Sequence, residues 1–232
     1  MLMDEKINAA SRIAGHGFGQ PHVLRTALTH TSFLHENPQH DTPSNERLEF
    51  LGDAVLQLLV TEELFGLHPD LTEGQLSKLR SHVVNEGSLA RLARKAGLQE
   101  CLLVGKGESQ QCDRDGLLAD ALEALLGAIY LDGGPSTARA AWQRWHDGEN
   151  LYDPRHLDDF DAKSRLQEFS LKSWQRLPLY QTQETRRERE TWFRVTLTLN
   201  DIPLLSTEGP SKRKAELWLA QACLRQGLHQ GV

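Results

Sequence analysis

Cysteine is scarce in this chain, with three residues among 232, and no two of them form a C-x-x-C spacing. Because an odd number of cysteines cannot pair completely, we expect reduced thiols rather than a framework of disulfide bonds. The ten histidines form no H-E-x-x-H motif and no Cys/His zinc spacing. The composition therefore argues against a disulfide-rich secreted domain and against the common zinc sites.

Long hydrophobic runs are also lacking. The longest, at residues 117–131, is too short to span a bilayer and contains Asp120 and Glu123. The first residues carry charges and no apolar segment follows them, so no signal peptide is expected. No G-x-S-x-G motif occurs, and the glycine-rich loop at 105–108 lacks the Gly-Lys-Ser/Thr of a P-loop. We expect a cytoplasmic protein with no membrane partner.

Charge is distributed unevenly along the chain. Residues 1–154 hold 13 Lys and Arg against 22 Asp and Glu, whereas residues 155–232 hold 13 against 10. The overall pI of about 5.9 would argue against nucleic-acid binding, but the basic second half weakens that argument. The asymmetry suggests two modules with different partners.

The periodicity of apolar residues divides the chain in the same region as the charge does. Residues 1–147 are predicted to form an all-α domain, because apolar residues recur at helical spacing in six segments, 23–28, 48–64, 76–84, 89–96, 117–131 and 138–145. Residues 148–160 are polar and aperiodic and are predicted to form a linker. Residues 161–230 are predicted to form a small α+β domain of order α-β-β-β-α.

The second domain is predicted from an alternating strand at 191–200, with flanking strands at 179–185 and 202–207. A helix at 163–174 precedes the strands. Ser211 is predicted to cap the last helix, and the residues expected on the apolar face of that helix are Ala215, Trp218, Leu219, Ala222 and Cys223.

The most informative run is Asn-Glu-Arg-Leu-Glu-Phe-Leu-Gly-Asp-Ala-Val-Leu at residues 45–56. A helix would place the carboxylates of Glu46, Glu49 and Asp53 along one face. The neighbouring residues are almost all apolar, which predicts a helix buried on all sides. Buried carboxylates must be protonated, paired or bound to a cation, so this run predicts a metal site.

A second run, at 117–131, contains only Asp120 and Glu123 as charges. Two such helices can face each other and enclose a hard divalent cation, Mg²⁺ or Mn²⁺, with oxygen ligands alone. The ion would remove the repulsion between the carboxylates. A solvated face or a salt bridge remains the alternative for each carboxylate taken singly.

The basic module carries Lys212, Arg213 and Lys214 directly after Ser211. Cations in the first turn oppose the helix dipole, so they are poorly placed for stability and well placed to meet phosphates. Arg186, Arg187 and Arg189, between the first two strands, either add a second contact or belong to an ordinary charged hairpin.

These runs together resemble bacterial ribonuclease III. Residues 45–56 are similar to the signature segment of the family, residues 27–33 to its N-terminal motif, and residues 118–127 to its second acidic motif. Residues 161–230 resemble a double-stranded-RNA-binding domain. In that domain the family usually has a histidine that enters the minor groove, and Arg189 stands at that position here.

The resemblance implies roles for individual residues. Glu49, Asp120 and Glu123 would be metal ligands, with Asp53 and Glu123 catalytic. Glu46 and Glu73 match positions linked to RNA contact or support between subunits, and Phe50 matches a residue of the homodimer interface. Gln167 and Glu168 would reach the minor groove, with Lys212, Arg213 and Lys214 on phosphates.

The resemblance also implies a function: a homodimeric, Mg²⁺-dependent endoribonuclease that cuts double-stranded RNA, including ribosomal-RNA precursors and messenger RNAs, to 5′-phosphate and 3′-hydroxyl ends. Two alternatives are weighed against it. A non-catalytic double-stranded-RNA-binding protein would not need the four acidic residues. An all-α metal-dependent nucleotide phosphohydrolase would leave the basic second domain unexplained.

Overall fold

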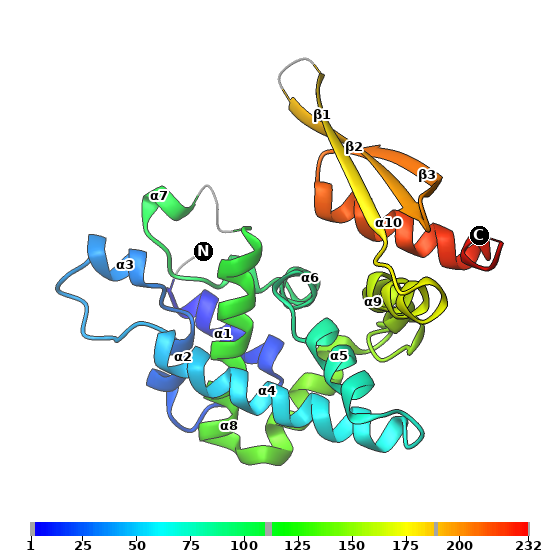
Figure 1. Ribbon diagram of the computed structural model, residues 1–232. Coiled ribbons are helices and arrows are strands. Elements are labelled where there is room, and N and C mark those ends of the chain that lie inside the picture. The colour runs from blue at the N-terminus through cyan, green and yellow to red at the C-terminus, as the bar shows by residue number, and fades with distance from the viewer. Residues whose placement is uncertain (1–2, 110–112, 188–189, 232) are drawn as a thin grey trace. The chain divides into compact units, whose positions relative to one another are not determined.

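The computed structural model describes residues 3–109, 113–187 and 190–231. The chain forms two compact units, Met1–Tyr152 and Asp153–Val232. The first unit is helical, and the second contains the only sheet among the described residues, with three strands (Figure 1). This agrees with the predicted order of a helical domain followed by an α+β domain.

The first unit is built around one long helical stretch, α8, which packs against α4, α6 and α2. A kink at Gly134, with φ 76° and ψ 180°, divides α8 where the sequence reads Gly-Gly-Pro. The helices of this unit are α1 (Met3–Ala14), α2 (Pro21–Ala27), α3 (Thr31–Glu36), α4 (Glu46–Leu67), α5 (Glu73–Val83), α6 (Glu86–Ala96), η1 (Leu98–Glu100), α7 (Lys106–Ser109) and α8 (Asp115–His146).

Two glycines set the close approach of α4 to α8. A Cβ atom on Gly52 would lie 1.8 Å from the carbonyl oxygen of Glu123, and a Cβ on Gly127 would lie 2.3 Å from the carbonyl oxygen of Leu48. No larger residue fits at either position without moving a backbone. The two acidic runs are therefore held side by side at a backbone-to-backbone contact.

A short extended segment ties the start of α4 to the loop that precedes α7. The amide of Leu103 donates to the carbonyl of Leu28 at 2.8 Å, and the amide of His30 donates back to Leu103 at 2.9 Å. The amide of Asn45, directly before α4, donates to the carbonyl of Thr29 at 2.9 Å. These backbone hydrogen bonds bring residues far apart in sequence to the same end of α4.

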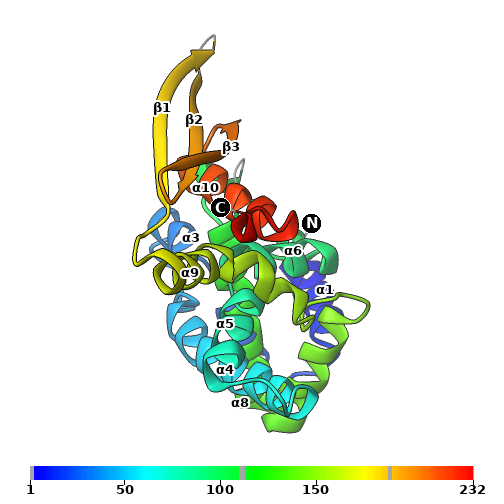
Figure 2. The same ribbon diagram turned by 45° about the vertical axis from the view of Figure 1, so that its right-hand side comes forward.

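The second unit consists of α9 (Arg155–Trp174), β1 (Leu179–Arg187), β2 (Glu190–Leu199), β3 (Ile202–Gly209), α10 (Lys212–Arg225) and η2 (Leu228–Gln230). The strands form an antiparallel sheet of order β1-β2-β3 (Figure 2). Alternate residues of β2, Val195, Leu197 and Leu199, are fully buried with residues of α9 and α10. The prediction of a half-buried central strand is confirmed, and Ser211 caps α10 by accepting from the amide of Lys214.

The structure differs from the expected linker at 148–160. Helix α9 begins at Arg155, eight residues before the predicted start, and the first unit continues to Tyr152. The carboxylate of Asp153 accepts a hydrogen bond from the amide of Arg155 at 2.8 Å, which satisfies a free donor at the start of the helix. The helix thus begins at a local polar contact, before the apolar residues from which its start was predicted.

Two predictions of burial are wrong. Helix α4 is not buried on all sides, because Phe50 is 82% exposed, Leu58 56% and Phe65 74%. Trp218, expected on the apolar face of α10, is 51% exposed. Both errors have one cause, because hydropathy identifies apolar residues but does not tell whether the rest of the chain packs over them.

Among the described residues, no helix is long and apolar enough to span a membrane.

Candidate metal centre and RNA-binding surface

Helix α4 supplies the first carboxylates of the site from its N-terminal half. The carbonyl of Asn45 accepts from the amides of Leu48 and Glu49, both at 2.9 Å, which starts the helix just before the acidic run. Glu46 and Glu49 lie in the first turn, where the helix dipole favours negative charge. One turn further on, Asp53 accepts from the side-chain amide of Gln57 at 3.0 and 3.2 Å.

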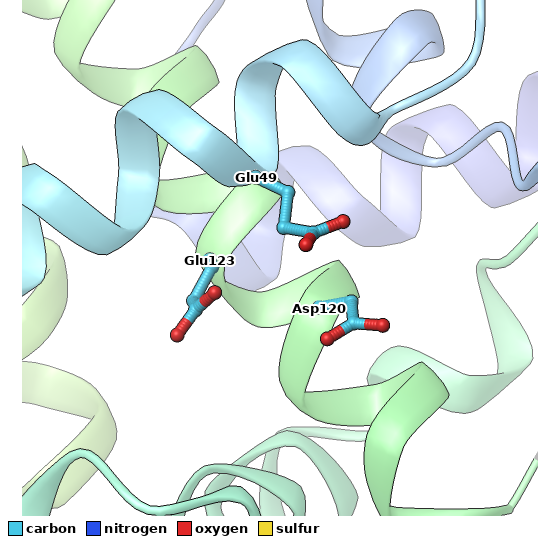
Figure 3. Close-up of side chains that lie close together, drawn as sticks. All are labelled: Glu49, Asp120 and Glu123. Carbon is cyan, nitrogen blue, oxygen red and sulfur yellow. The ribbon is translucent and has the colours of Figure 1, made fainter.

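Helix α8 supplies the other two carboxylates, Asp120 and Glu123. They meet Glu49 across the contact between the two helices, and oxygen atoms of the three side chains all lie within 4.8 Å of one another. Figure 3 shows the three side chains lying close together, Glu49 from α4 and Asp120 and Glu123 from α8. Within the described part of the chain, this is the only group of three or more such side chains that could hold a metal ion.

It is energetically unfavourable for all the carboxylates of this group to be charged at once in the absence of a cation. Burial, together with repulsion from neighbouring carboxylates, raises the pKa of Glu123 to about 8. The neighbours, in decreasing order of effect, are Asp53, Asp120 and Glu49. Burial and like charges also raise the pKa of Glu49 and of Asp120.

The donor set fits a hard divalent cation. Carboxylate oxygens are the ligands that Mg²⁺ and Mn²⁺ prefer, and such ions keep several of their own waters. A cation bound here would offset the repulsion that raises these pKa values. Asp53 lies close enough to raise the pKa of both Glu49 and Glu123, although it is outside the group of three.

The remaining acidic candidates lie apart from the three ligating groups. Glu46 is exposed and accepts from the hydroxyl of Ser44 at 2.8 Å, and its charge contributes to the raised pKa of Glu49. Glu73 accepts from the hydroxyl of Ser77 at 2.9 Å and lines a surface hollow with Thr61, at the far end of α4. The structure therefore does not bring Glu73 to the carboxylate group of its own chain.

Sequence reasoning assigned no role to three side chains next to Asp120. His30, Glu86 and Arg114 line a hollow of which Asp120 is also part. His30 lies in the N-terminal motif at 27–33, but a single histidine, glutamate or arginine has no spacing pattern that reveals its neighbours. Their proximity depends on how α3, α6 and α8 come together.

The candidate RNA-binding side chains lie on the surface of the second unit. Gln167 and Glu168 are exposed on α9, and Lys212, Arg213 and Lys214 are exposed in the first turn of α10. Helices α9 and α10 contact each other. Arg189 lies outside the described residues.

Comparison with known families accounts for both units. Residues 20–146 match the model of a ribonuclease-III-like family, and residues 162–226 match the double-stranded RNA binding motif. Fold and site thus define a class of protein, a helical nuclease with a carboxylate group and an attached double-stranded-RNA-binding domain.

Individual relatives narrow the class to one family. The chain is 38% identical to ribonuclease 3 of Syntrophobacter fumaroxidans, over 97% of its own length and 96% of the relative's. It is 42% identical to ribonuclease 3 of Oleidesulfovibrio alaskensis, over 86% and 88%. The nuclease domain of ribonuclease III from Campylobacter jejuni superposes with a TM-score of 0.56 at 38% identity, covering 62% of this chain and 98% of that one.

The chain belongs to the ribonuclease III family and is an endoribonuclease. The family is metal-dependent, in keeping with the group of Glu49, Asp120 and Glu123. Neither a non-catalytic RNA-binding protein nor a nucleotide phosphohydrolase accounts for both matches.

Proposed function

We propose that this protein is a Mg²⁺-dependent homodimeric endoribonuclease that hydrolyses phosphodiester bonds of double-stranded RNA to 5′-phosphate and 3′-hydroxyl ends. The observation that carries the proposal is the convergence of Glu49, Asp120 and Glu123 in a chain that also has a double-stranded RNA binding motif. The expected substrates are ribosomal-RNA precursors and structured messenger RNAs in the cytoplasm.

In this proposal Glu49, Asp120 and Glu123 hold the cation, for which Mn²⁺ can substitute. The bound ion supplies an activated water and stabilisation of the leaving 3′-oxygen. Asp53 adds negative charge beside these ligands, and its hydrogen bonds from Gln57 orient its carboxylate. Burial and the neighbouring carboxylates raise the pKa of Glu123 to about 8, so a bound cation would favour the charged form of this side chain.

RNA affinity is assigned mainly to the second unit. Lys212, Arg213 and Lys214 bind phosphates, and Gln167 and Glu168 enter the minor groove, where A-form RNA exposes its 2′-hydroxyls. Arg189 is assigned the minor-groove contact between β1 and β2. Such contacts read the shape of the duplex more than its sequence.

The homodimer is supported by a protrusion and a hollow at opposite ends of α4. Phe50 is 82% exposed, and a hollow of about 410 Å³ lies near Phe65, lined largely by Leu64, Leu71 and Leu76. Fifteen residues of helix separate Phe50 from Phe65, or about 22 Å. In a two-fold dimer each Phe50 would enter the partner's hollow.

This arrangement gives Glu73 a role that its own chain does not offer. Glu73 lines the hollow that would receive Phe50 of the second copy. It would then lie beside the acidic turn of that copy, the turn that contains Glu46. Two metal centres would face one duplex and cut both strands, leaving short 3′ overhangs.

The test is incubation of long duplex RNA with the protein, with and without Mg²⁺, followed by analysis of the ends. The expected products carry 5′-phosphates and 3′-hydroxyls and appear only with a divalent ion. Cleavage in the presence of a chelator, or 3′-phosphate ends, would overturn the proposal. Glu100→Gln, which neutralises an exposed carboxylate outside the group, serves as the control and should cleave normally.

A further inference from the structure

A hollow of about 340 Å³ adjoins the carboxylate group, because Asp120 lines it. The rest of its lining comes from His30, Glu86, Arg114 and the first residues of α8. This combination of an arginine, an imidazole and a carboxylate beside a metal centre is not explained by the roles proposed so far.

The ring of His30 is fixed by two neighbours. The amide of Ser32 donates to Nδ1 at 3.2 Å, and the hydroxyl of Ser32 lies 2.7 Å from the same atom while it accepts from the amide of Gly105 at 3.0 Å. Because Nδ1 accepts, the proton of the neutral ring lies on Nε2. Nε2 has no hydrogen-bond partner among the described residues, so this N–H is available to a ligand in the hollow.

Arg114 stands directly before α8 and lines the hollow, and a guanidinium group carries five donors in one plane. Arginine binds phosphate through two parallel hydrogen bonds, with geometry that lysine does not offer. Together with the Nε2–H of His30, it gives the hollow two side chains that can donate hydrogen bonds to one anionic group.

Three carboxylates also line the hollow, and two of them have other roles. Asp115 is paired with Arg94 at 2.7 Å, and Asp120 belongs to the metal centre. Glu86 is the remaining one, exposed at the start of α6. A carboxylate next to a phosphate-binding arginine is suited to accept a hydrogen bond from a ribose hydroxyl, which RNA has and DNA lacks.

We propose that this hollow is the subsite for the nucleotide next to the scissile bond, with Arg114 and His30 on its phosphate and Glu86 on its ribose 2′-hydroxyl. The proposal rests on the proposed function, since a strand whose scissile phosphate lies at the carboxylate group must place an adjacent nucleotide beside that group. It adds a substrate contact that the metal ligands and the second domain do not provide.

The test uses short RNA duplexes in which one phosphate near the cleaved bond is replaced by an uncharged methylphosphonate. Single-turnover cleavage by Arg114→Ala should be about 10- to 100-fold slower than wild type on unmodified RNA, the scale of one charge-assisted contact. At one replaced position, wild type should slow by a similar factor, and Arg114→Ala should lose nothing more.

His30→Asn tests the second donor, because asparagine keeps the cap of α3 but lacks the Nε2–H. Like Arg114→Ala, this variant should cleave RNA with the replaced phosphate no more slowly than it cleaves unmodified RNA. In the sugar arm, a single 2′-deoxy substitution at that nucleotide should slow wild type but not Glu86→Gln. Duplex affinity should change little in all three variants.

Normal cleavage by Arg114→Ala would overturn the subsite. So would independent slowing of cleavage by the variant and by the replaced phosphate, with factors that multiply at every position. If the 2′-deoxy substitution slows Glu86→Gln as much as it slows wild type, the proposed sugar contact is overturned. Arg91→Ala, an exposed arginine of α6 outside the hollow, is the charge-matched control. Failure of the proposed function would look different, because wild type itself would then leave unmodified duplex RNA uncut.

Discussion

Glu123 combines burial with the repulsion of three other carboxylates, and its pKa of about 8 follows from both. This has a consequence for the metal-free protein. In the folded state the carboxyl keeps its proton up to about pH 8, whereas in the unfolded chain it loses the proton near its ordinary value of 4.5. Between these values the folded state binds more protons, so stability falls as pH rises.

We therefore predict that the melting temperature in a chelator decreases from pH 5 to pH 8, and decreases less in Glu123→Gln. Glu49 and Asp120, whose pKa values are also raised, act in the same direction. Adding Mg²⁺ should raise the melting temperature of wild type more at pH 8 than at pH 5.5. The same pH slope in Glu123→Gln and wild type would contradict this account.

Individual residues of the site differ in how far sequence reveals them. Glu49, Asp120 and Glu123 could be predicted because charges stand out in otherwise apolar helices, and the structure brings their carboxyl groups together. His30 and Arg114 could not, because their meeting at one hollow depends on how α3 and α8 come together. Glu73 is the opposite case. The sequence resemblance gives it a functional role, but its position in the single chain does not explain that role.

At the scale of elements, the crossing of α4 and α8 determines the geometry of the site. We predict that Gly52→Ala destabilises the protein by about 1–3 kcal/mol, the usual cost of overpacking, because the new methyl group would lie 1.8 Å from the carbonyl oxygen of Glu123. The displaced helix should also weaken metal binding, measured by titration calorimetry.

Gly66→Ala is the matched control in the same helix, since a Cβ atom there meets nothing within 4 Å. It should leave metal binding unchanged and keep or raise stability through better helix propensity. Equal effects of the two substitutions on metal affinity would show that the close crossing does not position the carboxylates.

Periodicity predicted most of the longer helices, though not α1, and the central strand β2, with β1 and β3 expected beside it. It failed where other interactions decide. The first part of α9 is polar, with Asp158, Asp159 and Asp161, so no apolar stripe indicated a helix before residue 163. The exposed side of α4 was predicted to be buried because its residues are apolar. A sequence pattern shows that a helix face is apolar, but it does not show whether that face packs within its own chain or against a second chain.

At the scale of the whole molecule, the exposed apolar residues of α4 predict self-association. Phe50→Asp should convert the protein from a dimer to a monomer of 26.1 kDa in sedimentation velocity, because a charge would have to enter an apolar hollow. Leu177→Asp changes an equally apolar residue that is 57% exposed in the second unit and should leave the dimer intact. A monomeric wild type would refute the dimer.

The division of labour between the two units gives a prediction for salt dependence. Replacing Lys212, Arg213 and Lys214 by alanine should weaken duplex binding and reduce the slope of log affinity against log salt by about 1 per lost contact. Lys172→Ala and Arg225→Ala, which remove exposed cations elsewhere in the same unit, should change the slope less. An unchanged slope in the triple variant would place the phosphate contacts elsewhere.

The central claim is that one carboxylate group performs cleavage while other surfaces bind the duplex. Its most direct test measures binding and cleavage of the same duplex RNA side by side for wild type and Glu123→Gln in Mg²⁺. The account predicts duplex affinity within about twofold and a cleavage rate lower by at least about 100-fold, the scale of losing one charged group at a reacting centre. Cleavage by Glu123→Gln at the rate of wild type would contradict it.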